Sequence, residues 1–123
     1  FFVESFKKRL YLEERRQDMS KASFVASLLI EGQRIEKYKE AGNSMLPILK
    51  SNQPVTLEPV IDSTNLEIND IVFCKVKGNY YTHLISGVRN KNGHTEYQIS
   101  NNHKFVNGWI KKKNIFGRVV KIW

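Results

Sequence analysis

The sequence predicts a mainly β domain with helices confined to its N-terminal end. Short apolar runs separated by turn residues fill residues 34–123, as in proteins built from many short strands. The pairs Gly78-Asn79 and Asn92-Gly93 divide neighbouring runs in the way that hairpin turns do. Helical spacing of apolar residues is limited to residues 1–31. We therefore expect a helical extension over residues 1–33 and a β domain over residues 34–123.

Two helices are expected in the extension. Phe2, Phe6 and Leu10 recur at four-residue spacing, which predicts a charged amphipathic helix within the first nineteen residues. We expect this helix to pack on its own domain or on a partner. The alternative is that it faces nucleic acid with its basic residues, which are Lys7, Lys8, Arg9, Arg15 and Arg16. Ser20 is a suitable N-cap for a second helix that runs to about residue 31, and Gly32 is a suitable stop.

Six strands are expected in the β domain, at residues 34–40, 55–60, 71–77, 80–88, 96–99 and 115–123. The third and fourth form a hairpin. Pro59 lacks the N–H that a sheet ladder needs, so the strand over 55–60 is expected to lie at an edge or to end there. Residues 62–69 and 100–108 are expected to be loops, and residues 111–114 an exposed turn.

Composition limits the classes of protein and site. A single cysteine, Cys74, excludes an internal disulfide and suits a reducing compartment, so we expect a cytoplasmic protein. Val72 and Val76 flank Cys74 at period two, which predicts a core position for the thiol. No signal peptide or membrane-length apolar run is visible. His83, His94, His103 and Cys74 lack the spacing of a zinc site, so neither metal nor cofactor is expected.

One serine lies in a turn with a restricted backbone, in the segment Ala41-Gly42-Asn43-Ser44-Met45-Leu46-Pro47-Ile48-Leu49. Gly42 can adopt backbone angles closed to other residues, and Pro47 fixes its own φ and disfavours a helical Leu46. A serine held in such an apolar-walled turn can attack a carbonyl carbon or simply end a strand. The residues alone favour the second interpretation, because Ser, Gly and Pro fill ordinary turns.

This segment resembles the nucleophile segment of the superfamily that joins type I signal peptidases and self-cleaving SOS-type repressors. Later segments follow in the order of that superfamily. Asn69-Asp70-Ile71-Val72-Phe73 resembles its Gly-Asp-Ile-Val strand, Tyr81-Thr82-His83-Leu84-Ile85 falls where its general-base strand lies, and Gly117-Arg118-Val119-Val120 resembles its closing strand. The resemblance covers residues 34–123 and implies a strongly bent antiparallel sheet of the peptidase type.

The resemblance implies Ser44 as the nucleophile and His83 as the general base. Most members carry lysine at the second position, whereas the signal peptidases of the endoplasmic reticulum and of archaea carry histidine. With an unperturbed pKa of about 6.5, an imidazole is mostly neutral at pH 7 and can accept a proton. Without the resemblance, a half-buried histidine satisfied by the sheet is the simpler interpretation. With it, we predict a Ser-His dyad.

The third member of the site departs from the pattern of the relatives. Asn101 stands where the histidine-type relatives have aspartate, and Asn107 stands where a second acidic residue is often found. Asparagine can orient a histidine but adds no charge, and an Asp-to-Asn exchange in a serine triad costs about 10⁴-fold in rate. A further departure is Ser51-Asn52-Gln53, in place of a Gly-Asp pair. Asn43, Met45 and Pro47 are predicted to contact the substrate or the oxyanion.

Three functions are therefore open. The first is a serine endopeptidase that acts on a protein or peptide without a cofactor. The second is an inactive protein of the same fold that binds a protein partner as an inhibitor or adaptor. The third is a nucleic-acid-binding domain, because the net charge is +8 and basic and aromatic residues adjoin one another at Tyr80, Tyr81, Trp109, Lys111, Lys112 and Lys113. Self-cleavage is not expected, because the single Ala-Gly pair, Ala41-Gly42, lies too close to Ser44.

Overall fold

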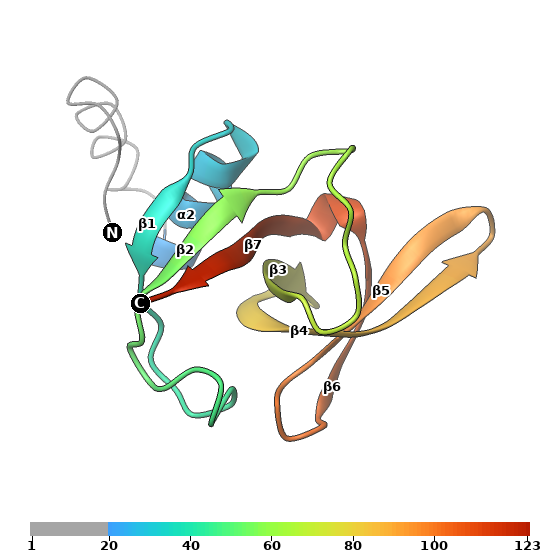
Figure 1. Ribbon diagram of the computed structural model, residues 1–123. Coiled ribbons are helices and arrows are strands. Elements are labelled where there is room, and N and C mark those ends of the chain that lie inside the picture. The colour runs from blue at the N-terminus through green and yellow to red at the C-terminus, as the bar shows by residue number, and fades with distance from the viewer. Residues whose placement is uncertain (1–19) are drawn as a thin grey trace.

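A computed structural model describes residues 20–123, so the helix predicted over residues 1–19 lies outside the described residues. This part of the chain contains one α-helix, seven strands and one short 3-10 helix (Figure 1). In chain order they are α2 (Lys21–Ile30), β1 (Ile35–Tyr38), β2 (Val55–Pro59), β3 (Ile71–Val76), β4 (Asn79–Lys91), β5 (His94–Ser100), β6 (Val106–Lys111), η1 (Lys112–Asn114) and β7 (Ile115–Ile122).

The seven strands form one antiparallel sheet in the order β1-β2-β7-β3-β4-β5-β6. Figure 1 shows α2 beside β1, β2 and β7, while β4 and β5 extend as a long hairpin at the other end of the sheet. The prediction of a mainly β fold is thus confirmed for residues 20–123. Pro59 is the last residue of β2, which pairs on both sides, so the proline ends an internal strand.

The boundaries of α2 follow from its capping residues. The Ser20 hydroxyl accepts a hydrogen bond from the N–H of Ser23 at 3.1 Å, which satisfies a donor that the first turn leaves free. At the other end Gly32 has φ +87°, and its N–H donates to the carbonyl of Leu29. The N–H of Gln33 donates to the carbonyl of Leu28, which completes a Schellman motif. The predicted cap and stop of the second helix are confirmed.

Helix α2 belongs to the core of the sheet. Phe24, Val25, Leu28 and Leu29 are buried in one hydrophobic cluster with residues of β1, β2 and β3. Leu29 lies over Gly117 of β7, where a Cβ atom would come within 2.9 Å of Leu29 Cδ1. The glycine therefore sets how closely the helix approaches the sheet.

Strand β3 supplies side chains to two clusters in alternation. Phe73 joins the cluster beneath α2, whereas Val72, Cys74 and Val76 join a second one with Ile85 and Ile99 among its members. Cys74 is fully buried, and burial raises the pKa of its thiol to about 12. The core position predicted for this cysteine is confirmed.

The hairpins match the predictions in part. Lys77 and Gly78 have φ +50° and +84°, so the β3–β4 turn lies one residue earlier than expected. Asn92 and Gly93, at φ +52° and +79°, form the second turn as predicted. Strand β4 runs on to Lys91, three residues beyond the predicted end at 88, because its pairing with β5 continues to that turn.

The loop predicted over residues 100–108 is wrong in its second half, where β6 begins at Val106. The chain reverses within 101–105, and Ser100 then pairs with Val106. This strand was not predicted because Asn107 and Gly108 are residue types common in turns. Gly108 has φ +152°, and a Cβ atom there would lie 3.1 Å from Val76 Cγ1, which favours glycine; Asn107 points its side chain at His83.

The contact between Leu29 and Gly117 generates a test of the fold. Gly117→Ala should lower the free energy of unfolding by about 1–3 kcal/mol, because the new methyl group overpacks the helix against β7. In a Leu29→Ala background the same change should cost less, since the opposing methyl groups are gone. Urea unfolding followed by circular dichroism measures both. An equal cost in the two backgrounds would contradict the proposed contact.

Candidate active site

The loop between β1 and β2, residues 39–54, holds Ser44 and is called the serine loop. Gly42 has φ +129°, and its N–H donates to Ser51 Oγ at 3.0 Å. The N–H of Asn52 donates to the carbonyl of Glu40 at 2.7 Å, which closes the base of the loop. Met45 and Leu49 are buried in the cluster beneath α2 and anchor the loop to the core. The backbone on both sides of Ser44 is therefore fixed.

A second loop, residues 101–105 between β5 and β6, holds the serine loop from the opposite side. The N–H of Asn102 donates to the carbonyl of Ser44 at 2.9 Å, and its side-chain amide donates to the carbonyl of Leu46 at 2.8 Å. His103 Nε2 donates to the carbonyl of Asn43 at 3.1 Å. Sequence reasoning missed both residues, because no spacing in the chain links them to the serine segment.

Ser44, His83 and Asn107 form a hydrogen-bonded chain. Ser44 Oγ lies 3.0 Å from His83 Nε2, and His83 Nδ1 lies 2.7 Å from Asn107 Oδ1. A carbonyl oxygen can only accept, so this assignment puts the imidazole proton on Nδ1. Nε2 then has a free lone pair and accepts the hydrogen bond of the Ser44 hydroxyl. This is the tautomer that a general base requires.

The environment of His83 keeps its imidazole neutral. The side chain is buried at 6% exposure, and its ring stacks on Tyr81 with ring centroids 4.8 Å apart. Burial lowers the pKa of His83 below its ordinary value of 6.5, while the hydrogen bond to Asn107 and the charge of Glu40 act in the opposite direction. A neutral imidazole at pH 7 can accept the proton of a serine hydroxyl.

The orienting position belongs to Asn107 and not to Asn101. The Oδ1 atom of Asn101 accepts the N–H groups of His103 at 2.8 Å and Phe105 at 3.0 Å, so it shapes the turn between β5 and β6. Asn107 lies on β6, beyond that turn, and its side chain reaches His83. The prediction that Asn101 orients the histidine is corrected by this geometry. Counting along the sequence missed the turn that separates the two asparagines.

Asn43, Met45 and Pro47, which were predicted to contact the substrate or the oxyanion, differ in the hydrogen bonds that their backbones make. Within residues 20–123, the N–H groups of Ser44 and Met45 have no hydrogen-bond acceptor. Pro47 has no N–H to offer. The carbonyl of Asn43 accepts from His103, so it contributes to holding the loop.

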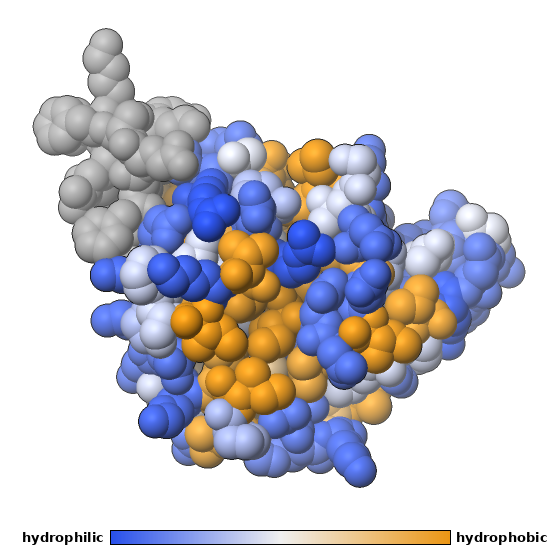
Figure 2. Space-filling view, in the orientation of Figure 1, coloured by the Kyte–Doolittle hydropathy of each residue, from blue (hydrophilic) through white to orange (hydrophobic). Residues whose placement is uncertain are grey.

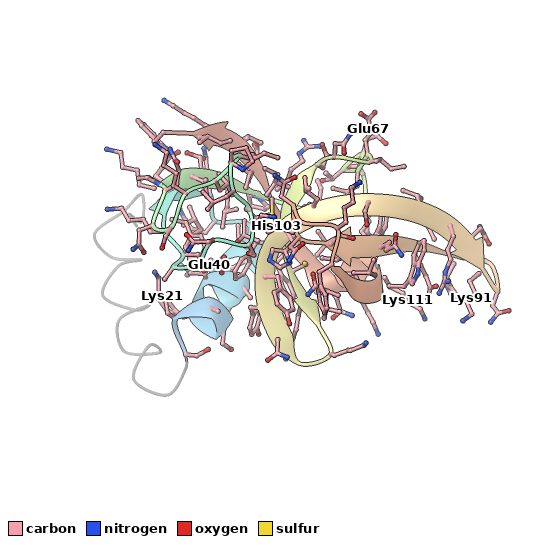
Figure 3. All side chains as sticks on the ribbon, turned by 90° about the horizontal axis from the view of Figure 1, so that it is seen from below. Lys21, Glu40, Glu67, Lys91, His103 and Lys111 are labelled. Atoms are coloured by element: carbon pink, nitrogen blue, oxygen red, sulfur yellow. The ribbon has the colours of Figure 1, made fainter. Side chains whose placement is uncertain are left out.

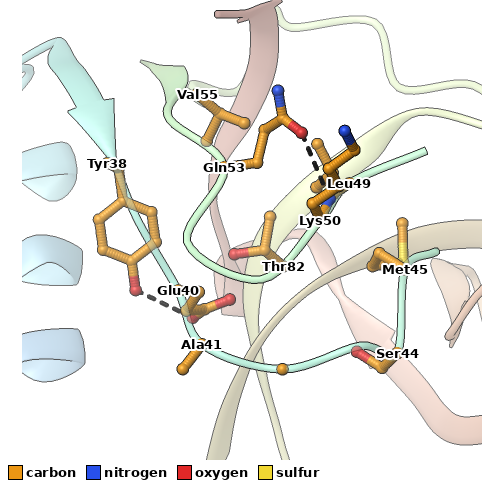
Figure 4. A pocket seen from close by; sticks show the side chains of 11 residues that line it. Tyr38, Glu40, Ala41, Ser44, Met45, Leu49, Lys50, Gln53, Val55 and Thr82 are labelled. Atoms are coloured by element: carbon orange, nitrogen blue, oxygen red, sulfur yellow. Dashed lines mark hydrogen bonds between the residues drawn. The ribbon is translucent and has the colours of Figure 1, made fainter. Parts of the chain in front are cut away.

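A small cavity lies beside Ser44, as Figure 4 shows. Its volume is about 40 Å³, and Tyr38, Glu40, Ser44 and Thr82 are among the residues that line it. The Tyr38 hydroxyl donates to Glu40 Oε1 at 2.9 Å. Thr82 Oγ1 is buried and has no hydrogen-bond partner in the described part of the chain. By the usual volume of a buried water, the cavity has room for about three waters or one small side chain.

Apolar side chains gather near the serine loop. Figure 2 shows them in the centre of the face seen in Figure 1, surrounded by hydrophilic side chains. Exposed apolar residues include Ile48 of the serine loop and Val120 and Ile122 of β7.

Among residues 20–123 no three His, Cys, Asp or Glu side chains come together as a metal site requires. No helix in the same range has the length and apolar character needed to cross a bilayer.

The electrostatics of the site can be tested by titration. Glu40→Gln and Asn107→Ala should each lower the pKa of His83 further, because the wild-type groups raise it. Two-dimensional NMR of the His83 ring protons measures the shift. Glu67→Gln removes a carboxylate from the exposed β2–β3 loop and should leave the titration unchanged. A wild-type His83 that titrates at or above pH 6.5 would contradict the dominance of burial.

No family model matches this chain, and no curated protein is similar enough to be matched to it.

Proposed function

We propose that this chain is a serine endopeptidase in which Ser44 is the nucleophile and His83 is the general base. The observation that carries the proposal is the hydrogen-bonded chain from Ser44 Oγ to His83 Nε2, at 3.0 Å, and from His83 Nδ1 to Asn107 Oδ1, at 2.7 Å. Both distances lie within the range that proton transfer requires. The order of the segments, which resembles that of the signal peptidase and SOS-repressor superfamily, supports the same assignment.

The reaction follows from these positions. His83 Nε2 accepts the hydroxyl proton as Ser44 Oγ attacks the peptide carbonyl carbon. The N–H groups of Ser44 and Met45 stabilise the negative oxygen. The protonated His83 then donates its proton to the leaving amine, and an ester between Ser44 and the acyl half of the substrate remains. Water hydrolyses this ester with His83 as the base.

The cavity beside Ser44 suggests which substrates the enzyme takes. Its volume of about 40 Å³ suits a small side chain next to the scissile bond. The unpartnered hydroxyl of Thr82 would gain a hydrogen bond from a polar group in that side chain or from a water beside it. The buried, single Cys74 suits action in a reducing compartment such as the cytoplasm.

A specific observation favours a second candidate, an inactive protein of this fold that binds a protein partner. The group that orients His83 is the neutral amide of Asn107, which cannot stabilise an imidazolium ion by charge. The carboxylate of Glu40, which belongs to the serine loop, favours the protonated imidazole and so supplies part of this charge. Labelling of the serine distinguishes the two candidates.

A fluorophosphonate probe tests the proposal directly. The wild-type chain should be labelled at Ser44, and Ser44→Ala and His83→Ala should abolish labelling to a similar extent, because the two groups act as one unit. Labelling should persist below pH 6.5 and decline as the pH falls through the lowered pKa of His83, where the ring becomes protonated and can no longer accept the proton. Mass spectrometry of the labelled chain measures both effects.

Matched variants control for reactivity elsewhere. Ser63→Ala and His94→Ala alter an exposed serine and an exposed histidine and should leave labelling unchanged. If the wild-type chain is as inert as Ser44→Ala, the endopeptidase assignment is wrong and the inactive protein is favoured.

The orienting role of Asn107 gives a separate prediction. Asn107→Asp should raise both the pKa of His83 and the labelling rate, because a carboxylate stabilises the imidazolium that forms. The reverse exchange in a serine triad lowers the rate about 10⁴-fold, and we expect Asn107→Asp to raise the labelling rate by part of that factor. Asn101→Asp should give no such gain, since its side chain serves the turn. Equal gains from the two variants would refute the assignment.

A further inference from the structure

A groove lined by lysines lies apart from the serine site. It has a volume of about 510 Å³ and is bounded by the β3–β4 turn on one side and by β6 and η1 on the other. Four lysines line it, Lys75, Lys77, Lys111 and Lys113. Figure 3 shows Lys111 on the hairpin side of the molecule, away from Glu40, which lines the cavity beside Ser44.

The positive charge of this lysine groove is not neutralised. Glu96 is the one acidic residue in its lining, and its carboxylate pairs with Arg89 at 2.8 Å. Across residues 20–123, no carboxylate lies within 4.0 Å of any of the four ammonium groups. Lys112 differs, since its ammonium group donates to the carbonyls of Asp62 and Thr64 and holds the β2–β3 loop. A concave surface with this charge attracts anions.

The arrangement of the lysines indicates what kind of anion fits. They come from β3, from the β3–β4 turn, from β6 and from η1, and the Lys75 ammonium group also lies over the Tyr80 ring, 5.3 Å from its centroid. A flexible chain with one phosphate per nucleotide can adapt to charges carried by several elements, and lysine binds phosphate well as a compact point charge. The Arg89 guanidinium lies over the Trp109 ring, 4.1 Å from its centroid, so that indole face is already occupied. Recognition would therefore depend on the phosphates.

We infer that the lysine groove binds single-stranded nucleic acid through its phosphate backbone, without reading the bases. This binding site is independent of the proposed peptidase chemistry, because no residue of the groove contacts Ser44, His83 or Asn107 by a hydrogen bond.

Fluorescence anisotropy with the full chain and a labelled 20-nucleotide oligothymidylate tests the inference. For four phosphate contacts, the logarithm of affinity should fall with the logarithm of salt at a slope of about −2.8, so affinity drops about 50-fold between 50 and 200 mM salt. Lys111→Gln with Lys113→Gln should flatten the slope by about 1.4, which reduces that drop to about 7-fold.

Two controls make the result decisive. Lys39→Gln with Lys50→Gln removes the same charge from exposed positions in the serine loop, outside the lysine groove, and should leave the slope as in the wild type. Circular dichroism checks that all variants fold. An unchanged slope in the groove variant would overturn the inference. So would equal or tighter binding of a duplex, or of polyglutamate of the same length, at the same salt concentration.

Discussion

The pairing of β7 with both β2 and β3 is the constraint on which the rest of this structure depends. Leu57 of β2 pairs with Val119, and Val72 of β3 pairs with Arg118. The serine loop is attached to the β1–β2 side of this junction, whereas His83 and Asn107 lie on strands beyond β3. A strand from late in the sequence therefore joins the two halves of the candidate site, and the site assembles only when residues 115–122 are in place.

The chemistry of the candidate site is set by where charge is placed. In a triad with an aspartate, a buried carboxylate both orients the histidine and stabilises its protonated form. Here orientation comes from the neutral Asn107 amide, and a negative charge comes from Glu40, which is itself part of the serine loop. Since burial dominates, the pKa of His83 is lowered. A base with a lowered pKa is more fully deprotonated at neutral pH but has a weaker affinity for the proton it must accept.

Local patterns in the sequence predicted much of the fold, whereas contacts between residues far apart in the sequence could not be predicted from them. Ser20 caps α2 through its own hydroxyl, and Gly32 and the Asn92-Gly93 turn act through their backbone angles, so these effects could be read from neighbouring residues. The sequence also pointed to Ser44 and His83, which lie within hydrogen-bond distance, although their catalytic role stays a prediction. Which asparagine faces His83 depends on a turn whose length and pairing no local pattern fixes.

The hydrogen bonds from Asn102 to the carbonyls of Ser44 and Leu46 tie the 101–105 loop to the serine loop. The position of the serine hydroxyl is thus set partly by a residue outside the Ser44-His83-Asn107 chain. Variation at position 102 or in the length of the 101–105 loop would move Ser44 relative to His83 while leaving both side chains intact. The 101–105 loop is thus a place where sequence change could adjust the distance between Ser44 and His83 by degrees, without altering either residue.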